Sequence, residues 1–269
     1  MYEYRQVDSD FNRHLQEYKC ILKYLQIVIC GAKCTRQTQV NIRQKTLYLD
    51  TVPLKKNPCA LEWVLLLSSQ YFPSIADIVS DNAGYEMFAD LCLADVLCTS
   101  SLADKVRFHV KAMPWFISDT TKYDFYWVLQ MLAELSEKSS SLPALATKWE
   151  QYLQSGRWTV EAENFWTLPH PYNRMKATDH NLYIKLSEAT LVIFKGDLNY
   201  RKLVGETNWL PTESFANALQ GFHPAPLVAL RTVKADLICG LQPGQADLIA
   251  SKSHDWMTSG NYAVIQFDG

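Results

Sequence analysis

The chain has 269 residues, of which 48% are hydrophobic and 20% charged, and this length suits one large α/β domain or two small ones. Its net charge of −2 provides no basic field for general nucleic-acid binding. The polar start Met1-Tyr2-Glu3-Tyr4-Arg5 does not resemble a signal peptide, and no apolar run has the length of a membrane span. We therefore expect a protein without membrane or nucleic-acid partners.

The chain has seven cysteines, an odd number, and no signal peptide precedes them. Both observations argue against a disulfide framework, so we interpret the cysteines as reduced thiols. They lie at positions 20, 30, 34, 59, 92, 98 and 239. Cys30 and Cys34 have no second Cys or His pair nearby, which argues against a zinc site. A cytoplasmic location is expected, and a nuclear one is also compatible with this pattern.

In the first part of the chain, hydrophobic periodicity predicts helices and short strands separated by polar turns. The expected elements are a helix over 1–30, a strand at 47–49, a short buried helix over 61–69, a strand over 75–79 and a helix over 85–98. The run Asp81-Asn82-Ala83-Gly84 separates the last two elements.

The alternation of strand and helix continues through the rest of the chain. We expect a strand over 106–110, a loop over 114–121, a helix over 124–135, a turn over 137–143, a helix over 145–153, a long loop over 160–180, and strands at 190–194 and 228–230. This order predicts a three-layer α/β/α fold with a largely parallel, mixed central sheet. Residues 71–269 are expected to form that domain.

Two polar turns follow neighbouring predicted strands and carry candidate metal ligands. Asp81 and Asn82 come after the strand over 75–79, and Asp119 comes after the next strand. Two carboxylates and one amide at one sheet edge can hold a hard divalent cation. The competing interpretation is that Asp81 or Asn82 caps the helix after Gly84, and that Asp119 caps the helix near residue 124.

The strongest single signal is an apolar strand that ends abruptly in a charged sequence. Leu191 to Phe194 are apolar, and the polar side chains of Lys195, Asp197, Asn199, Tyr200 and Arg201 follow at once, with Leu198 among them. Open α/β sheets bind ligands beyond the carboxyl ends of their strands. These groups therefore suit a phosphorylated or otherwise anionic small molecule.

The sequence Arg231-Thr232-Val233-Lys234 follows the last predicted strand. Its two cations can bind phosphate by charge and hydrogen bonding. Alternatively, they are long side chains on a surface edge of the sheet. No Gly-rich phosphate loop, Gly-x-Ser-x-Gly sequence or His-Glu-x-x-His sequence is present. No motif in the chain therefore indicates a serine hydrolase or a zinc protease.

Taken together and in order, these motifs resemble the damage-control phosphatases of subfamily III, a group of sugar phosphate phosphatases that includes proteins described as acidic residue methyltransferases. The resemblance covers about residues 75–269. It is carried by Asp81 to Glu86, His109 to Lys111, Pro114 to Phe116, Ser118-Asp119, Phe165 to Thr167, Pro169 to Tyr172, Phe194 to Leu203, Arg231 to Lys234 and Gly240 to Gly244. Relatives usually carry an N-terminal helical domain, so residues 1–70 are interpreted as a divergent or truncated remnant of it.

The resemblance implies a metal-dependent phosphatase that hydrolyses phosphometabolites such as fructose 1-phosphate. It implies that Asp81, Asn82 and Asp119 hold Mn²⁺, Co²⁺ or Ni²⁺, with Mg²⁺ also suitable, and that Asp81 and Asp119 are catalytic. The implied substrate-binding residues are Asp81, Asn82, Asp197, Leu198, Asn199, Tyr200, Arg201 and Lys234. Asp81 would act either as nucleophile or by orienting a water molecule.

Two alternatives accompany this hypothesis. The first is a protein-glutamate carboxyl methyltransferase that uses S-adenosylmethionine, for which the resemblance implies that Glu86 and Asp119 contact the cofactor. The second is a truncated homologue that retains the site without catalysis. The sequence does not indicate an oligomeric state.

Overall fold

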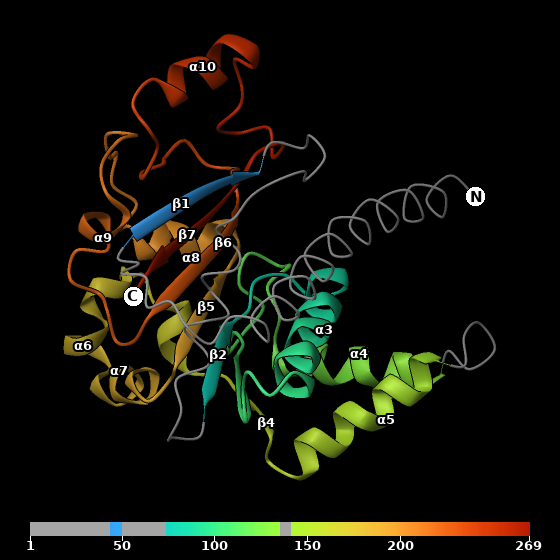
Figure 1. Ribbon diagram of the computed structural model, residues 1–269. Coiled ribbons are helices and arrows are strands. Elements are labelled where there is room, and N and C mark those ends of the chain that lie inside the picture. The colour runs from blue at the N-terminus through green and yellow to red at the C-terminus, as the bar shows by residue number, and fades with distance from the viewer. Residues whose placement is uncertain (1–43, 50–73, 135–140) are drawn as a thin grey trace, which may run out of the picture.

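The computed structural model describes the backbone of residues 44–49 and the whole of residues 74–134 and 141–269. Its centre is a seven-stranded sheet in the order β1-β7-β6-β5-β2-β3-β4 (Figure 1). The strands are β1 Gln44–Leu49, β2 Ile75–Val79, β3 Lys105–His109, β4 Trp158–Glu161, β5 Leu191–Lys195, β6 Leu227–Thr232 and β7 Ala263–Asp268. The expected strand at 47–49 lies in β1, whereas the helices expected over 1–30 and 61–69 lie outside the described residues.

The sheet is mixed but mostly parallel, as expected. Strands β6, β5, β2, β3 and β4 run parallel to one another, and β7 runs antiparallel to both β6 and β1. The strands β2 and β5 are buried along nearly their whole length, which explains why both are mostly apolar rather than alternating. The exception in β2 is Asp77, whose buried carboxylate is paired with Arg107.

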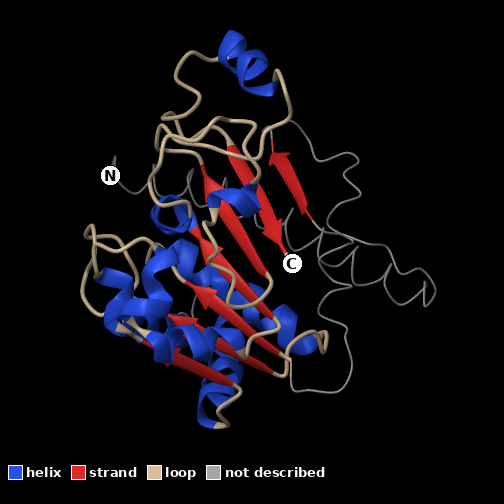
Figure 2. Cartoon of the chain, turned by 90° about the vertical axis from the view of Figure 1, so that its left-hand side faces the viewer, coloured by secondary structure: helices blue, strands red, loops and turns tan. Residues whose placement is uncertain are grey.

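Helices cover both faces of the sheet and complete a three-layer arrangement (Figure 2). The helices are α3 Tyr85–Thr99, α4 Lys122–Glu134, α5 Ser141–Gln154, α6 Met175–Thr178, α7 His180–Ser187, α8 Gly196–Leu203, α9 Phe215–Ala218 and α10 Gln245–Lys252, with short 3₁₀ turns η2 Asn164–Thr167 and η3 Tyr172–Arg174. On one face, α3, α4 and α5 pack on Ile78, Phe108 and Ile193. On the other, α7, α8 and α9 pack on Val79, Val192 and Phe194. Alternate residues of one strand thus supply the two cores.

Several elements differ from the sequence expectations. The turn expected over 137–143 is partly wrong, because α5 begins at Ser141 and includes Pro143; proline in a first helical turn loses no hydrogen bond. The loop expected over 160–180 contains the end of β4, both 3₁₀ turns and α6. Helix α7, helix α10 and the antiparallel strand β7 were not expected.

The order of the strands places a topological switch between β2 and β5. The chain runs outward from β2 to β3 and β4, and then returns to the other side of β2 as β5 before it continues to β6. The crossovers therefore leave β2 and β5 in opposite directions, which opens a crevice at their carboxyl ends. The residues that follow these two strands are Ser80 to Gly84 and Gly196 to Asp197.

No helix in the described part of the chain is both long enough and apolar enough to cross a membrane.

Candidate functional site

The turn after β2 and the loop after β3 are joined by their backbones at the carboxyl edge of the sheet. Asn82 and Asp119 form an isolated antiparallel bridge, and the Thr120 amide donates to the Asp81 carbonyl at 2.7 Å. Gly84 has φ 72° and ψ −126° before α3 begins, a conformation that side chains disfavour. The structure thus brings the three predicted metal ligands together, although their role in binding a metal is still a prediction.

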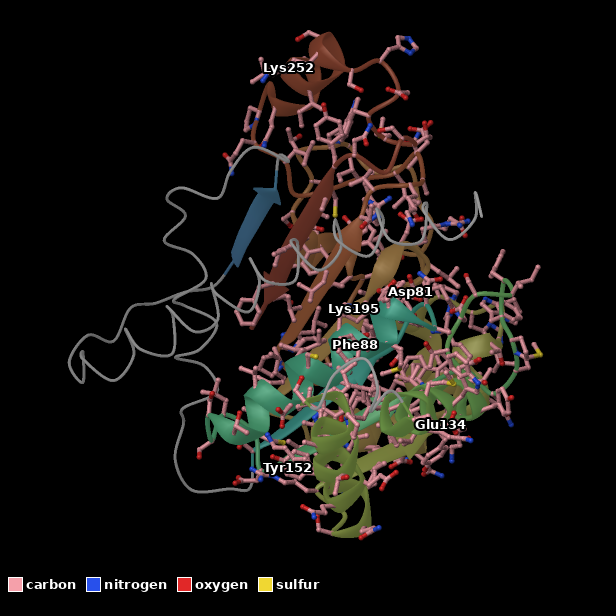
Figure 3. All side chains as sticks on the ribbon, turned by 90° about the vertical axis from the view of Figure 1, so that its right-hand side faces the viewer. Asp81, Phe88, Glu134, Tyr152, Lys195 and Lys252 are labelled. Carbon is pink, nitrogen blue, oxygen red and sulfur yellow. The ribbon has the colours of Figure 1, made fainter. Side chains whose placement is uncertain are left out.

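The carboxylate of Asp81 lies directly against the first residue of α8. A Cβ atom built on Gly196 would be 1.8 Å from Asp81 Oδ2, and Gly196 has φ +84°. Only glycine combines this backbone conformation with this close approach. Residue 196 is therefore glycine because the end of β5 must pass next to a buried carboxylate. Figure 3 labels Asp81 and Lys195, the residue that precedes Gly196.

Burial and like charges raise the pKa of Asp81 to about 7, since Glu86 and Asp119 are nearby and only partly offset by Lys111 and Lys195. Asn82 Nδ2 donates to Asp81 Oδ2 and to Glu86 Oε2, both at 2.9 Å. Burial alone would raise the pKa of Glu86, but Lys195 and the Asn82 hydrogen bond together lower it. This centre, formed by the carboxylates of Asp81, Glu86 and Asp119, therefore carries negative charge that Lys111 and Lys195 do not fully neutralise.

Lys195, the last residue of β5, anchors α3 to this centre. Its ammonium binds Asp90 Oδ1 at 2.5 Å and Glu86 Oε1 at 3.2 Å. Burial raises the pKa of Asp90 to about 6 despite the opposing charge of Lys195. Lys195 was expected to face an anionic ligand, but in the structure it is 5% exposed and already paired with α3.

Lys111, two residues after β3, connects the three segments of the site. Its ammonium donates to the Ser80 carbonyl at 2.8 Å and lies 3.4 Å from both Asp119 Oδ1 and Asn199 Oδ1. Burial lowers the pKa of Lys111, while Asp119 acts in the opposite direction. Although Lys111 occurs in a motif that carries the resemblance, sequence reasoning assigned it no role, because nothing local shows that it points inward.

The predicted substrate-binding residues of α8 divide between the site and the core. Asn199 is fully buried; its amide donates to the Lys195 carbonyl at 2.7 Å and its oxygen accepts from Tyr172 at 2.6 Å. Tyr200 is also fully buried, with its hydroxyl 3.2 Å from Cys239 Sγ. The structure therefore places the ring of Tyr200 in the core, away from any ligand.

The other members of this segment are less buried. Leu198 is partly buried in the first turn of α8, and Arg201 is paired with Glu206 just beyond the end of the helix. Asp197 accepts from Arg231 Nε at 2.7 Å and from the Lys234 amide at 3.3 Å. The start of α8 is thus tied to the segment after β6.

Within Arg231-Thr232-Val233-Lys234, only the last residue presents its side chain to solvent beside the site. Arg231 is 2% exposed; its guanidinium binds Asp197 and the carbonyls of Ala235 and Leu237, and it stacks on Tyr200. Lys234 is exposed and its charge contributes to lowering the pKa of Glu86. The expected anion-binding role thus suits Lys234, whereas Arg231 is a buried structural cation.

The donor set at this edge fits a hard divalent cation. Asp119 Oδ1 is buried and accepts no hydrogen bond, with the ion-paired Lys111 ammonium 3.4 Å away, and Asn82 uses only its amide nitrogen in the hydrogen bonds described above. Two carboxylates and one amide oxygen leave coordination positions for water and substrate. Within residues 74–134 and 141–269, no group of three or more His, Cys, Asp and Glu side chains is arranged to hold a metal, so the amide is an essential part of this fit.

A hollow of about 510 Å³ opens beside the loop that carries Asp119. Its wall includes Lys111, Pro114, Ile117, Thr121, Tyr123 and Asp124. This volume is within the range of small-molecule pockets.

Comparison with known proteins identifies relatives along most of the chain. A family model described as the damage-control phosphatase ARMT1-like domain matches residues 57–249. The protein named damage-control phosphatase ARMT1 from Mus musculus is 48% identical over 196 residues, covering 72% of this chain and 44% of the relative. Proteins of the same name from Danio rerio and Homo sapiens are 41% and 39% identical, covering 91% and 97% of this chain and 57% and 61% of the relatives. The chain thus spans about half the length of the curated relatives that it matches.

Proposed function

Because this chain belongs to the damage-control phosphatase ARMT1-like family, we propose that it is a metal-dependent phosphatase of phosphorylated metabolites such as fructose 1-phosphate. The observation that carries this proposal is the convergence of Asp81, Asn82 and Asp119 at the switch between β2 and β5. Similarity to proteins named as damage-control phosphatases supports the same reaction class.

In this proposal Asp81, Asn82 and Asp119 hold a divalent ion such as Mn²⁺, Co²⁺, Ni²⁺ or Mg²⁺. Such an ion supplies Lewis-acid polarisation of a phosphoryl oxygen. Phosphoryl transfer depends mainly on positioning and charge neutralisation, so the protein's contribution is a fixed arrangement of charges. Lys111 holds Asp119 in place through its ion pair, and the Asn82 amide holds both Asp81 and Glu86.

The start of α8 and the segment after β6 would receive the phosphate. The first amides of a helix favour anions, and α8 begins directly against Asp81. Lys234 is exposed next to this point and adds a positive charge. Asp197 fixes the two segments together through Arg231 and the Lys234 amide. A phosphorylated small molecule bound here would contact α8 and Lys234 at once.

The test is phosphate release from fructose 1-phosphate by the 269-residue chain with Mn²⁺, before and after chelation with EDTA. We expect activity to disappear on chelation and to return with Mn²⁺, and Asp119→Asn to lower turnover by about 100-fold or more. Asp247→Asn is the matched control, because Asp247 is an exposed residue in the first turn of α10. Activity that survives both chelation and Asp119→Asn would contradict the metal-dependent mechanism. A folded chain that releases no phosphate from any phosphorylated metabolite would instead favour the non-catalytic homologue.

The alternative proposal is that the chain is a carboxyl methyltransferase. It would require Glu86 and Asp119 to contact S-adenosylmethionine, and both lie in the same cluster as the candidate metal ligands. Transfer of a labelled methyl group from S-adenosylmethionine to protein glutamates, lost in Glu86→Gln, would support it.

A further inference from the structure

Lys202 is a partly buried cation whose position is fixed by neutral groups. It lies on α8 three residues after Asn199, and its ammonium donates to the carbonyls of Leu168 at 2.7 Å and Trp166 at 3.1 Å. The same ammonium lies 5.3 Å from the ring centroid of Tyr172 and 5.9 Å from that of Phe165. Carbonyl dipoles and aromatic faces hold a cation in place without cancelling its charge.

Tyr172 connects the Lys202 side chain to the candidate metal centre. Tyr172, whose ring lies beside the Lys202 ammonium, donates its hydroxyl to Asn199, which also lies 3.4 Å from Lys111. Burial and repulsion from Lys111 lower the pKa of Lys202 to about 8, while the attraction of Asp119 acts in the opposite direction. Lys202 thus lies within electrostatic range of both Lys111 and Asp119.

The other buried or partly buried cations around the centre already have carboxylate partners. Lys195 binds Asp90 and Glu86, Lys111 pairs with Asp119, and Arg231 binds Asp197. In the part of the chain that the structure describes, Lys202 has no carboxylate within ion-pair distance. Keeping a partly desolvated ammonium without a counter-ion is costly, and an arriving anion would offset that cost.

We propose that Lys202 is an additional anion-binding residue whose ammonium contacts a phosphate oxygen of the substrate on the Asp119 side of the centre. This inference rests on the proposed phosphatase function and extends it by a residue. The phosphate is then held between two sources of positive charge, Lys234 after β6 and Lys202 on α8. The ammonium has a third N–H beyond the two that donate to carbonyls, and in this proposal that N–H donates to the phosphate.

The informative substitution is Lys202→Gln, because an amide can still donate to the 166–168 carbonyls but carries no charge. Lys202→Met removes both properties, and Lys176→Met is the matched control. Lys176 is an exposed lysine on α6 that likewise lies over an aromatic ring, with its ammonium 5.5 Å from the Tyr183 centroid. Two quantities are measured with Mn²⁺ present: the Michaelis constant for fructose 1-phosphate, and the dissociation constant of inorganic phosphate by calorimetry.

We expect Lys202→Gln and Lys202→Met each to raise both constants by about tenfold or more, the effect of losing a charge-assisted hydrogen bond. The turnover number should change much less, and Lys176→Met should leave both constants unchanged. Unaltered constants in Lys202→Gln would overturn the proposal and leave Lys202 as a support for the 164–168 segment. If Lys202→Met does not fold, Lys202→Gln decides alone, and if both fail to fold the residue is structural and the proposal is wrong.

Calorimetry separates this inference from the proposed function. A wild-type chain that binds inorganic phosphate but hydrolyses no metabolite would contradict the phosphatase proposal, while weaker phosphate binding in Lys202→Gln would still support the role of Lys202. If the wild-type chain hydrolyses fructose 1-phosphate and Lys202→Gln does so with unchanged constants, the phosphatase proposal is supported and the role of Lys202 is contradicted.

Discussion

Replacement of Gly196 by alanine tests whether the close approach of β5 to Asp81 holds the site together. The added Cβ would lie 1.8, 2.2 and 2.7 Å from Oδ2, Cγ and Cβ of Asp81, so the carboxylate or the start of α8 must move. The left-handed conformation at φ +84° costs about 1–2 kcal/mol for a residue with a side chain, and overpacking at a buried position adds about 1–3 kcal/mol. We therefore expect Gly196→Ala to lower the free energy of unfolding by about 2–5 kcal/mol.

Gly156→Ala is the matched control, because Gly156 has φ +71° and an added Cβ there would have no atom within 4 Å. It should lose only the conformational cost of about 1–2 kcal/mol. Urea unfolding of both variants gives their losses of stability, and the difference between the two losses measures the contact with Asp81. The Mn²⁺ affinity of each variant is measured in parallel. The double variant Asp81→Ala/Gly196→Ala lacks Asp81 Oδ2 and Cγ, the two atoms closest to the added Cβ. It should therefore lose less stability than the sum of the losses in the two single variants, and the difference is their coupling energy. Equal destabilisation by Gly196→Ala and Gly156→Ala, with unchanged Mn²⁺ affinity, would refute this reasoning.

Two further predictions concern buried charges beneath the site. Arg231→Met should lower the free energy of unfolding by about 3–5 kcal/mol, because it removes the ion-pair partner of Asp197 and the guanidinium donor of the buried Leu237 carbonyl. Urea unfolding compared with the exposed Arg174→Met measures this loss, and equal stabilities of the two variants would contradict it. His109 lies between Asp77 and Glu163, at 3.5 and 3.1 Å; burial lowers its pKa, but these two carboxylates outweigh burial and raise it to about 9. Its stabilising contribution should therefore be present below pH 6.5 and be lost as the pH rises to about 9. The difference in free energy of unfolding between wild type and His109→Gln should shrink across that pH window. A constant difference would show that His109 does not change its charge there.

Those parts of the site that depend on local sequence could be predicted. The apolar run before Asp81, the Gly84 break and the helix over 85–98 correspond to β2, the turn and α3, because each signal lies within a few neighbouring residues. The abrupt end of the apolar run at Lys195 likewise predicted that α8 starts at a sheet edge. Parallel topology then implied that Asp81 and Asp119 would lie at the same edge.

Features that depend on contacts between distant segments could not be predicted. The structural role of Arg231 follows from Asp197 and from two carbonyls beyond the strand, and the burial of Tyr200 follows from its neighbour Cys239. The positions of Lys111 and Lys202 are set by segments more than 30 residues away. A lysine in a polar stretch looks the same in sequence whether it faces solvent or a buried centre, so only the fold distinguishes the two.

The central claim is that Asp81, Asn82 and Asp119 form one divalent-metal site at the switch between β2 and β5. The most direct measurement is anomalous X-ray diffraction from crystals of the chain grown with Mn²⁺. We predict a single strong peak with oxygens of these three side chains at roughly 2.0–2.6 Å, and its loss in Asp119→Asn crystals. A peak bound by other residues, or no peak at this edge of the sheet under saturating Mn²⁺, would contradict the claim.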